Sequence, residues 1–216
     1  MAESMQPAQP AGYPMALSVD YPDRSLDRLT TFFRILAIIP IAVILGMVSG
    51  GGAGWEDSNW RYPGATGGLL FLPTLLMILF RQKYPRWWFD WNLGVIKFST
   101  RVTAYFALLR DEYPSTDEDQ AVHVNTAYPN VREGLSRWMP LVKWLLAIPH
   151  YIVLAFLVFA AVVATIIAWF AILLTGRYPK DLFEFVVGVM RWFLRVNAYA
   201  FLLVTDRYPP FSLSAG

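Results

Sequence analysis

His150 is the residue whose position most clearly suggests chemistry, because it follows Pro149 just inside a long apolar stretch. A titratable side chain at membrane depth can exchange a proton, bind a haem iron or hydrogen-bond a neighbouring helix. When the two halves of the chain are aligned, the counterpart of His150 is Ile41, so symmetry supplies no partner for it. We expect an intramembrane polar site at His150, with a structural hydrogen bond as the leading role and haem ligation as an alternative.

Six basic residues stand beside apolar segments, where a cation can contact a lipid phosphate or a partner's carboxylate: Arg34, Lys97, Arg101, Lys143, Arg191 and Arg195. Lys97 and Arg101 are four residues apart, as are Arg191 and Arg195, so each pair shares one helix face. Arg34 and Lys143 both precede a proline by six residues. We expect contacts with lipid headgroups or a partner; the alternative is that these side chains snorkel as solvated anchors.

Residues for catalysis are missing from the sequence. It has no cysteine, which excludes thiolate catalysis and Cys-ligated metals, and His123 lies in a polar linker without a second ligand at metal-site spacing. The glycine runs Gly50-Gly51-Gly52 and Gly67-Gly68 lack the Lys-Ser/Thr of a phosphate-binding loop, and no serine stands in a nucleophile elbow. We therefore predict no enzymatic activity, no bound metal and no cofactor.

The overall composition predicts a membrane protein. Apolar residues make up 56% of the 216 residues and charged residues 16%, against about 25% charged in an average soluble domain. The net charge of +2 is too small to indicate a nucleic-acid partner. The basic residues occur among Trp and Tyr beside apolar runs, as they do at lipid headgroups.

Two stretches of the chain align without a gap, which predicts a tandem repeat. The segments that begin at Tyr84-Pro85 and Tyr178-Pro179 keep register through these pairs: Phe89 and Phe183, Gly94 and Gly188, Arg101-Val102 and Arg195-Val196, Ala104-Tyr105 and Ala198-Tyr199. Upstream, Arg34 and Pro40 correspond to Lys143 and Pro149. We expect a disordered tail over 1–18, one copy over 19–115, a linker over 116–127 and a second copy over 128–216.

The apolar segments of the first copy are expected at about 31–47 and 67–80. Basic residues flank their outer ends, whereas the connecting stretch 50–68 holds Glu56, Asp57 and only Arg61. By the positive-inside rule, this pattern predicts a hairpin with both ends cytoplasmic.

The second copy has one uninterrupted apolar stretch over 145–175, which permits two interpretations. As one helix it would be roughly 46 Å long, well beyond the ~30 Å hydrocarbon core. As a tight hairpin of segments 141–159 and 161–176, each arm would be short for a complete span. Basic residues at both ends favour the hairpin.

An amphipathic helix is expected after each apolar pair, at about 86–110 and 180–205. Charged residues recur there at helical spacing opposite Trp and Phe, which is typical of a helix lying in the membrane interface. A Tyr-Pro pair precedes each segment, and proline commonly marks a helix boundary. The predicted fold class is an all-α integral membrane protein with two tandem repeats, each an apolar helical hairpin followed by an amphipathic interfacial helix.

Several stretches of the second copy resemble the bacterial membrane family called domain of unknown function 4389: Ala-Ile-Pro-His at 147–150, Thr-Gly-Arg-Tyr-Pro at 175–179, Arg-Val-Asn-Ala-Tyr at 195–199 and Thr-Asp-Arg-Tyr-Pro-Pro-Phe at 205–211. The first copy is similar to it more loosely, since Ile41 replaces the histidine. The resemblance implies a bacterial inner-membrane location and brings no catalytic residues.

The leading functional hypothesis is a non-catalytic accessory or scaffold subunit of an inner-membrane complex. It would be multi-pass with both termini cytoplasmic, and its partners would be anionic membrane lipids and other integral membrane subunits. The alternative is a lipid or small-molecule binding or transport protein with a site between the two copies, near Arg34, Lys143 and His150.

Overall fold

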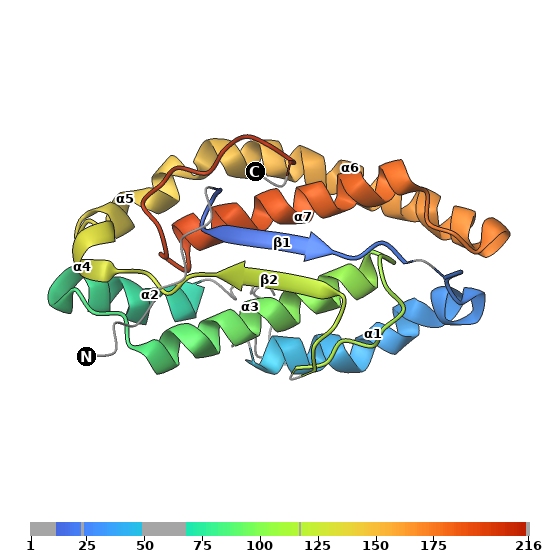
Figure 1. The fold of residues 1–216 in the computed structure, drawn as a ribbon, viewed down its shortest axis with the longest axis horizontal. Helices are drawn as coiled ribbons and strands as arrows, with labels where there is room; N and C mark the ends of the chain where they lie inside the picture. Colours follow the sequence, from blue (N-terminus) through green and yellow to red (C-terminus); the bar gives the residue numbers. More distant parts are fainter. Residues whose placement is uncertain (1–11, 23, 49–67, 117, 215–216) are drawn as a thin grey trace, which may run out of the picture.

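The computed structural model describes residues 12–22, 24–48, 68–116 and 118–214, and it is mostly helical. Its helices are α1 (Arg28–Val48), α2 (Gly68–Leu76), the π-helical turn η1 (Met77–Arg81), α3 (Arg86–Phe106), α4 (Val131–Gly134), α5 (Met139–Leu146), α6 (Ile148–Thr175) and α7 (Lys180–Ala200). The strands are β1 (Met15–Val19) and β2 (Val122–Thr126). Figure 1 shows these elements along an elongated molecule.

The two strands form an antiparallel ribbon, which corrects the expectation of an all-α fold. β1 lies in the predicted disordered tail except for its last residue, Val19, and β2 lies in the predicted linker. Leu17 pairs with Val124 at the centre of the ribbon. Met15, Leu17, Val122 and Val124 are buried, while the residues between them are exposed. Each strand is five residues long, and its partner lies more than a hundred residues away. Local periodicity therefore did not predict the pairing.

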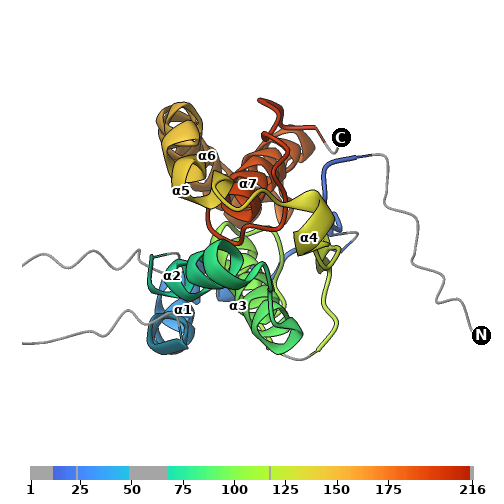
Figure 2. The same ribbon diagram turned by 90° about the vertical axis from the view of Figure 1, so that its left-hand side faces the viewer.

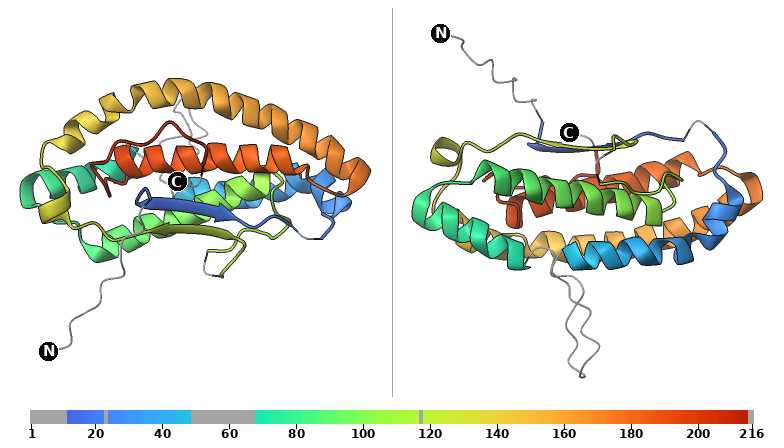
Figure 3. Two further views of the ribbon diagram at one scale, coloured as in Figure 1. Left: turned by 45° about the horizontal axis from the view of Figure 1, so that its top comes forward. Right: turned by 90° about the horizontal axis from the view of Figure 1, so that it is seen from below.

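The molecule has three layers, seen edge-on in the right-hand view of Figure 3. The ribbon packs on the middle layer, α3 and α7, and its buried side chains join one hydrophobic core with Phe89 of α3 and Phe183 of α7. The helices α1, α2, α5 and α6 form the third layer, on the far side of α3 and α7 (Figures 2 and 3). We call this third layer the outer layer.

α6 is one continuous helix, so the predicted hairpin of 141–159 and 161–176 is wrong. Residue 160, where the two predicted arms would meet, and the residues on both sides of it are helical. After Pro149 the stretch contains no proline or glycine until Gly176, which ends the helix in a left-handed conformation, φ 74°, with its N–H donating to the Ile172 carbonyl at 2.7 Å. The helix packs on α7 through one stripe that includes Leu154, Ala164 and Ala168.

α1 and α2 follow one another along the length of the molecule, where a hairpin would place them side by side (Figures 1 and 3). The predicted hairpin of the first copy is therefore also wrong for the described residues. The predicted loop, 50–68, lies almost entirely outside those residues. Together, α1, α2 and η1 run in the direction opposite to α5 and α6 (Figure 1).

α3 and α7 begin where the Tyr-Pro pairs placed them, after Pro85 and Pro179. Both end earlier than the expected limits of 110 and 205. Just beyond each helix a leucine takes a left-handed conformation, Leu108 at φ 63° and Leu203 at φ 57°, and the chain turns away. A non-glycine residue pays a steric penalty there, so burial of both leucines must offset it.

Among the described residues, α6 is the one helix long and apolar enough to cross a membrane; a second candidate arises if the bent parts of α1 count as one span. Only 17% of the most apolar window of α6 is buried inside the protein, so most of its side chains face outward.

Candidate functional site

Arg34 lies inside the protein instead of at its surface. Only 2% of the residue is exposed, and its guanidinium forms an ion pair with Asp111, just beyond α3. Nη1 also donates to the carbonyls of Tyr105 at 3.0 Å and Arg110 at 2.8 Å, and the Tyr105 ring lies 4.4 Å from Cζ. The expectation that Arg34 contacts a headgroup or snorkels is therefore wrong in this structure.

Lys143 on α5 is in a corresponding environment at the other end of the molecule. It is 0% exposed, its Nζ lies 2.7 Å from Asp206 Oδ1, and it donates to the Thr205 carbonyl at 2.8 Å. The Tyr199 ring lies 5.2 Å away. Burial lowers the pKa of Lys143, while its hydrogen bond to Asp206 and the Asp206 charge act in the opposite direction. Lys143 too is corrected from a headgroup contact to an internal ion pair.

The two ion pairs match in detail. Asp111 Oδ2 accepts the backbone N–H of Asp27 at 2.8 Å, and Asp206 Oδ2 accepts that of Ser136 at 2.7 Å. In each case the aspartate stands two residues before a Tyr-Pro pair, whose tyrosine packs edge-on against Tyr105 or Tyr199. Neither aspartate was among the site residues expected from the sequence. Their shared spacing to Tyr-Pro was the available signal.

The ion pairs lie at opposite ends of the long axis, since α1 begins at one end and α5 lies at the other (Figure 1). The structure therefore does not bring Arg34 and Lys143 together around one cavity. The predicted site between the two copies, with both cations lining it, is not formed by the described residues.

Arg191 and Arg195 are covered by the two chain ends, although they were expected on a solvated helix face. Arg195 is 1% exposed and donates to the carbonyls of Ser212 at 3.2 Å and Ser214 at 2.7 Å. Arg191 donates to the carbonyls of Leu17 in β1 at 3.1 Å and Leu213 at 2.9 Å. Burial, followed by the charge of Arg191, lowers the pKa of Arg195. A headgroup contact by Arg195 is therefore wrong in this structure.

The equivalent pair on α3 is less enclosed. Arg101 is half-buried, and its Nη1 donates to the Ser115 carbonyl at 2.8 Å. Lys97 is also half-buried, and the described residues provide it with no hydrogen bond or ion pair. Of the six expected contact residues, Lys97 is thus the one that the described structure leaves free for an external anion.

Gly188 on α7 allows the C-terminal segment to lie close to the helix. A Cβ at this position would stand 2.9 Å from Leu213 Cβ and 3.1 Å from its carbonyl oxygen. At the aligned Gly94 of α3, an added Cβ would meet nothing within 4 Å. Gly188 therefore accommodates the close approach of Leu213, whereas Gly94 lies beside open space.

We predict that Gly188→Ala lowers the free energy of unfolding by about 1 kcal/mol or more, since overpacking outweighs the gain in helix propensity. Gly94→Ala, the matched control, should raise it by up to about 1 kcal/mol. Thermal unfolding in detergent measures both, and limited proteolysis should show earlier cleavage near 210–214 only in Gly188→Ala. Equal effects from both substitutions would contradict the close packing of Leu213.

His150 is enclosed by aromatic rings. It is 0% exposed, the indole Nε1 of Trp192 donates to its Nδ1 at 3.1 Å, and the Phe211 ring stacks on it with centroids 4.0 Å apart. Nε2 is buried, and no described residue forms a hydrogen bond with it. Packing and one hydrogen bond explain the position of His150; Nε2 lies buried in the described structure, whereas a haem iron would need an open approach to it.

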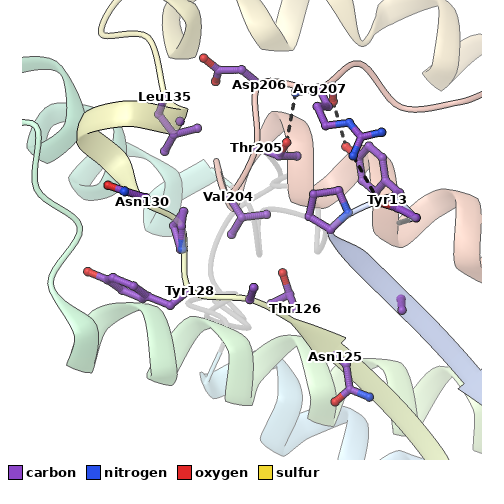
Figure 4. A pocket seen from close by; sticks show the side chains of 16 residues that line it. Tyr13, Asn125, Thr126, Tyr128, Asn130, Leu135, Val204, Thr205, Asp206 and Arg207 are labelled. Atoms are coloured by element: carbon purple, nitrogen blue, oxygen red, sulfur yellow. Dashed lines mark hydrogen bonds between the residues drawn. The ribbon is translucent and has the colours of Figure 1, made fainter. Parts of the chain in front are cut away.

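A cavity of about 570 Å³ lies between the residues before β1, the segment after β2 and the loop after α7. Figure 4 shows the side chains around it, which are mostly uncharged; Tyr13 donates to the Arg207 carbonyl at 3.2 Å across one side. Asp206 at its edge is the partner of Lys143. Among the described residues, no group of three His, Asp or Glu side chains could hold a metal ion.

The outer layer also has an extensive apolar surface that no other described segment covers. Large hydrophobic side chains are exposed along all four of its helices, with Phe156 at 74% and Phe159 at 71% on α6. Other members of this surface are Phe32, Leu36 and Ile39 on α1, Leu72 and Leu76 on α2, Trp144 on α5, and Ile152, Ile166 and Phe170 on α6. This surface is the candidate functional site, and its chemistry is that of contact with lipid or with another apolar surface.

Comparison with protein families gives a match to part of the chain. Residues 137–212 match the model of the family described as Domain of unknown function (DUF4389), a stretch that runs from just before α5 to beyond α7. This finding supports the family resemblance seen in the second half of the sequence. No curated protein and no solved structure matches the chain.

Proposed function

We propose that this chain is a non-catalytic accessory or scaffold subunit of a bacterial inner-membrane complex, and that its outer layer contacts lipid and neighbouring subunits. The observation that carries this proposal is the apolar surface of α1, α2, α5 and α6. Contiguous exposed apolar patches beyond a few hundred Å² are rare on soluble monomers and mark contacts with proteins or membranes.

The contacts of the buried charged side chains also support a structural role. Arg34, Lys143 and Arg195 are buried and bonded to carbonyls or carboxylates of the same chain. Such groups hold the helices and the chain ends together, and they are not directed toward a substrate. The charged residues in the interior therefore serve the fold, and the exposed apolar residues are left to make the external contacts.

The proposal includes two tandem copies of one unit, linked by crossed contacts. The hydroxyl of Tyr21, near the start of the first copy, donates to the Tyr178 carbonyl in the second. The hydroxyl of Tyr128, near the start of the second, donates to the Tyr84 carbonyl in the first. Each copy thus contributes a hydrogen bond to the Tyr-Pro pair that precedes the amphipathic helix of the other copy. The two copies together form one rigid platform for partners.

The test is purification from native membranes in a gentle detergent, followed by mass measurement of the intact assembly. We expect the chain in stoichiometric association with integral membrane subunits. The triple variant Phe156→Ala, Phe159→Ala and Ile166→Ala should lose at least tenfold in partner recovery. Trp87→Ala, an exposed aromatic residue on α3 in the middle layer, is the matched control. Recovery of the wild-type chain alone and monomeric would overturn the proposal.

A further inference from the structure

We propose that the outer layer lies within one leaflet of an anionic bilayer, so that α6 runs parallel to the membrane and both of its ends stay on the same side. This inference rests on the membrane location proposed above. It replaces the expected crossing with an in-plane arrangement.

The first argument is the order of the three layers. The outer layer exposes apolar side chains, α3 and α7 carry charged and aromatic residues, and the exposed residues of the ribbon are mostly polar. Figure 3 shows these three layers in that order. This order matches hydrocarbon, headgroups and water along the membrane normal. A single layer of helices is about 10–12 Å thick, and one leaflet contributes about half of the ~30 Å hydrocarbon core. The outer layer therefore fits in one leaflet.

The second argument is the position of the ribbon. β1 and β2 lie alongside α7 and α3 near the middle of the long axis (Figure 1). If α6 crossed the membrane along that axis, the ribbon would stand at the bilayer centre. Ser18, His123 and Asn125 are exposed on its outer face, and open sheet edges do not occur in contact with hydrocarbon. A crossing of α6 along its own axis is thus unfavourable.

The third argument is charge at both ends of the outer layer. Exposed basic residues gather where α1 begins and α6 ends: Arg24, Arg28, Arg177 and Lys180. A second group gathers where η1 ends and α5 begins: Arg81, Lys83, Arg86 and Arg137. Asp27 and Asp181 stand beside the first group and leave it net positive. Each basic residue near an anionic leaflet contributes about 1 kcal/mol.

Local contacts hold these groups together. Arg24, Arg177 and Lys180 line one recess of about 280 Å³ with Tyr21 and Tyr178. At the other end, the Arg137 guanidinium donates to the Gln82 side chain at 2.8 Å. Both ends of the outer layer thus present cations of a kind that complements lipid phosphates.

The length and the curvature of α6 also favour an orientation parallel to the membrane. With 28 residues it is about 42 Å long, which exceeds the hydrocarbon thickness by about 12 Å. It arches, and both of its ends bend toward the middle layer (Figure 3). The basic residues at each end of α6 favour the cytoplasmic side of the membrane. Both ends of a continuous helix can lie on that side only if the helix does not cross the membrane.

Because the sequence contains no cysteine, single-cysteine variants can map this arrangement directly. We choose three exposed positions: Ser136→Cys before α5, Asp181→Cys at the start of α7, and Ser18→Cys on β1 as the ribbon marker. Each is expressed in the full chain and labelled with a membrane-impermeant maleimide in right-side-out and inside-out membrane vesicles. Thermal unfolding of each variant checks that it retains the wild-type fold.

All three cysteines are expected to react from the same side, at least tenfold faster than from the other. Val162→Cys in mid-α6, carrying a nitroxide in vesicles of phosphatidylcholine and phosphatidylglycerol, should report a depth within one leaflet. If Ser136→Cys and Asp181→Cys react from opposite sides, the in-plane arrangement is overturned while membrane residence stands.

Loss of the chain from the membrane in a carbonate wash would instead overturn both proposals. A dimer in water whose Val162→Cys label is shielded from aqueous reagents would assign the outer layer to a second copy of the chain.

Discussion

Lys143→Met is expected to lower the free energy of unfolding by about 3 kcal/mol, because it leaves the Asp206 carboxylate without its cation. Lys143 is fully buried, and the Asp206 side chain is 20% exposed, so little water can replace the lost partner. The Thr205 carbonyl loses a donor at the same time. Denaturant unfolding in detergent, followed by tryptophan fluorescence, measures the change.

Two variants control for the loss of a lysine and for the loss of the pair. Lys97→Met removes a half-buried lysine without an ion pair among the described residues, and it should change stability by no more than about 0.5 kcal/mol. Lys143→Met with Asp206→Leu removes both charges, and it should recover most of the lost stability. If Lys143→Met and Lys97→Met were equally stable, the buried ion pair would not hold the fold. Arg34→Met should repeat the result at the other end.

The second large effect is expected from charge in the outer layer. Phe156→Asp with Phe159→Asp should reduce the amount of protein in carbonate-washed membranes at least a hundredfold. A carboxylate at the centre of an apolar helix costs about 2.5–3.5 kcal/mol on insertion scales. The cost of two carboxylates is therefore larger than the free energy that corresponds to a hundredfold reduction. Quantitative blotting of soluble and membrane fractions measures the distribution.

The matched control places the same charges on the ribbon. Ala16→Asp with Asn125→Asp changes two exposed positions on the strands, outside the outer layer. This variant should stay in the membrane fraction at the wild-type level. Equal retention of both double variants would show that α6 does not face hydrocarbon, and the proposed membrane contact would then fail.

The start of each amphipathic helix was predictable from nearby residues. Pro85 and Pro179 lack the backbone N–H that a helix interior requires, and charged and aromatic residues alternate at helical spacing after them. The apolar character of 145–175 was equally plain from composition. Such features depend on a few neighbouring residues, and short-range sterics and hydrogen bonding suffice to specify them.

The sequence alone also aligned Arg34 with Lys143, Tyr105 with Tyr199 and Gly94 with Gly188. It did not identify the groups that pair with the buried cations. Asp111 and Asp206 lie about 60 to 80 residues from their cations, and the carbonyls that cover Arg195 belong to a segment that turns back after α7. Pairings at that distance depend on how the layers pack, and no local pattern encodes them.

By itself, the sequence determined that the chain is mostly helical, that its apolar residues cluster into long segments, and that the basic residues stand at their margins. Tertiary structure alone decided that α6 is continuous, that β1 pairs with β2, and that Arg34, Lys143 and Arg195 are internal. The physical reason is that hydrophobicity and helix propensity act over a few residues, whereas burial of a charge depends on which distant segments pack around it.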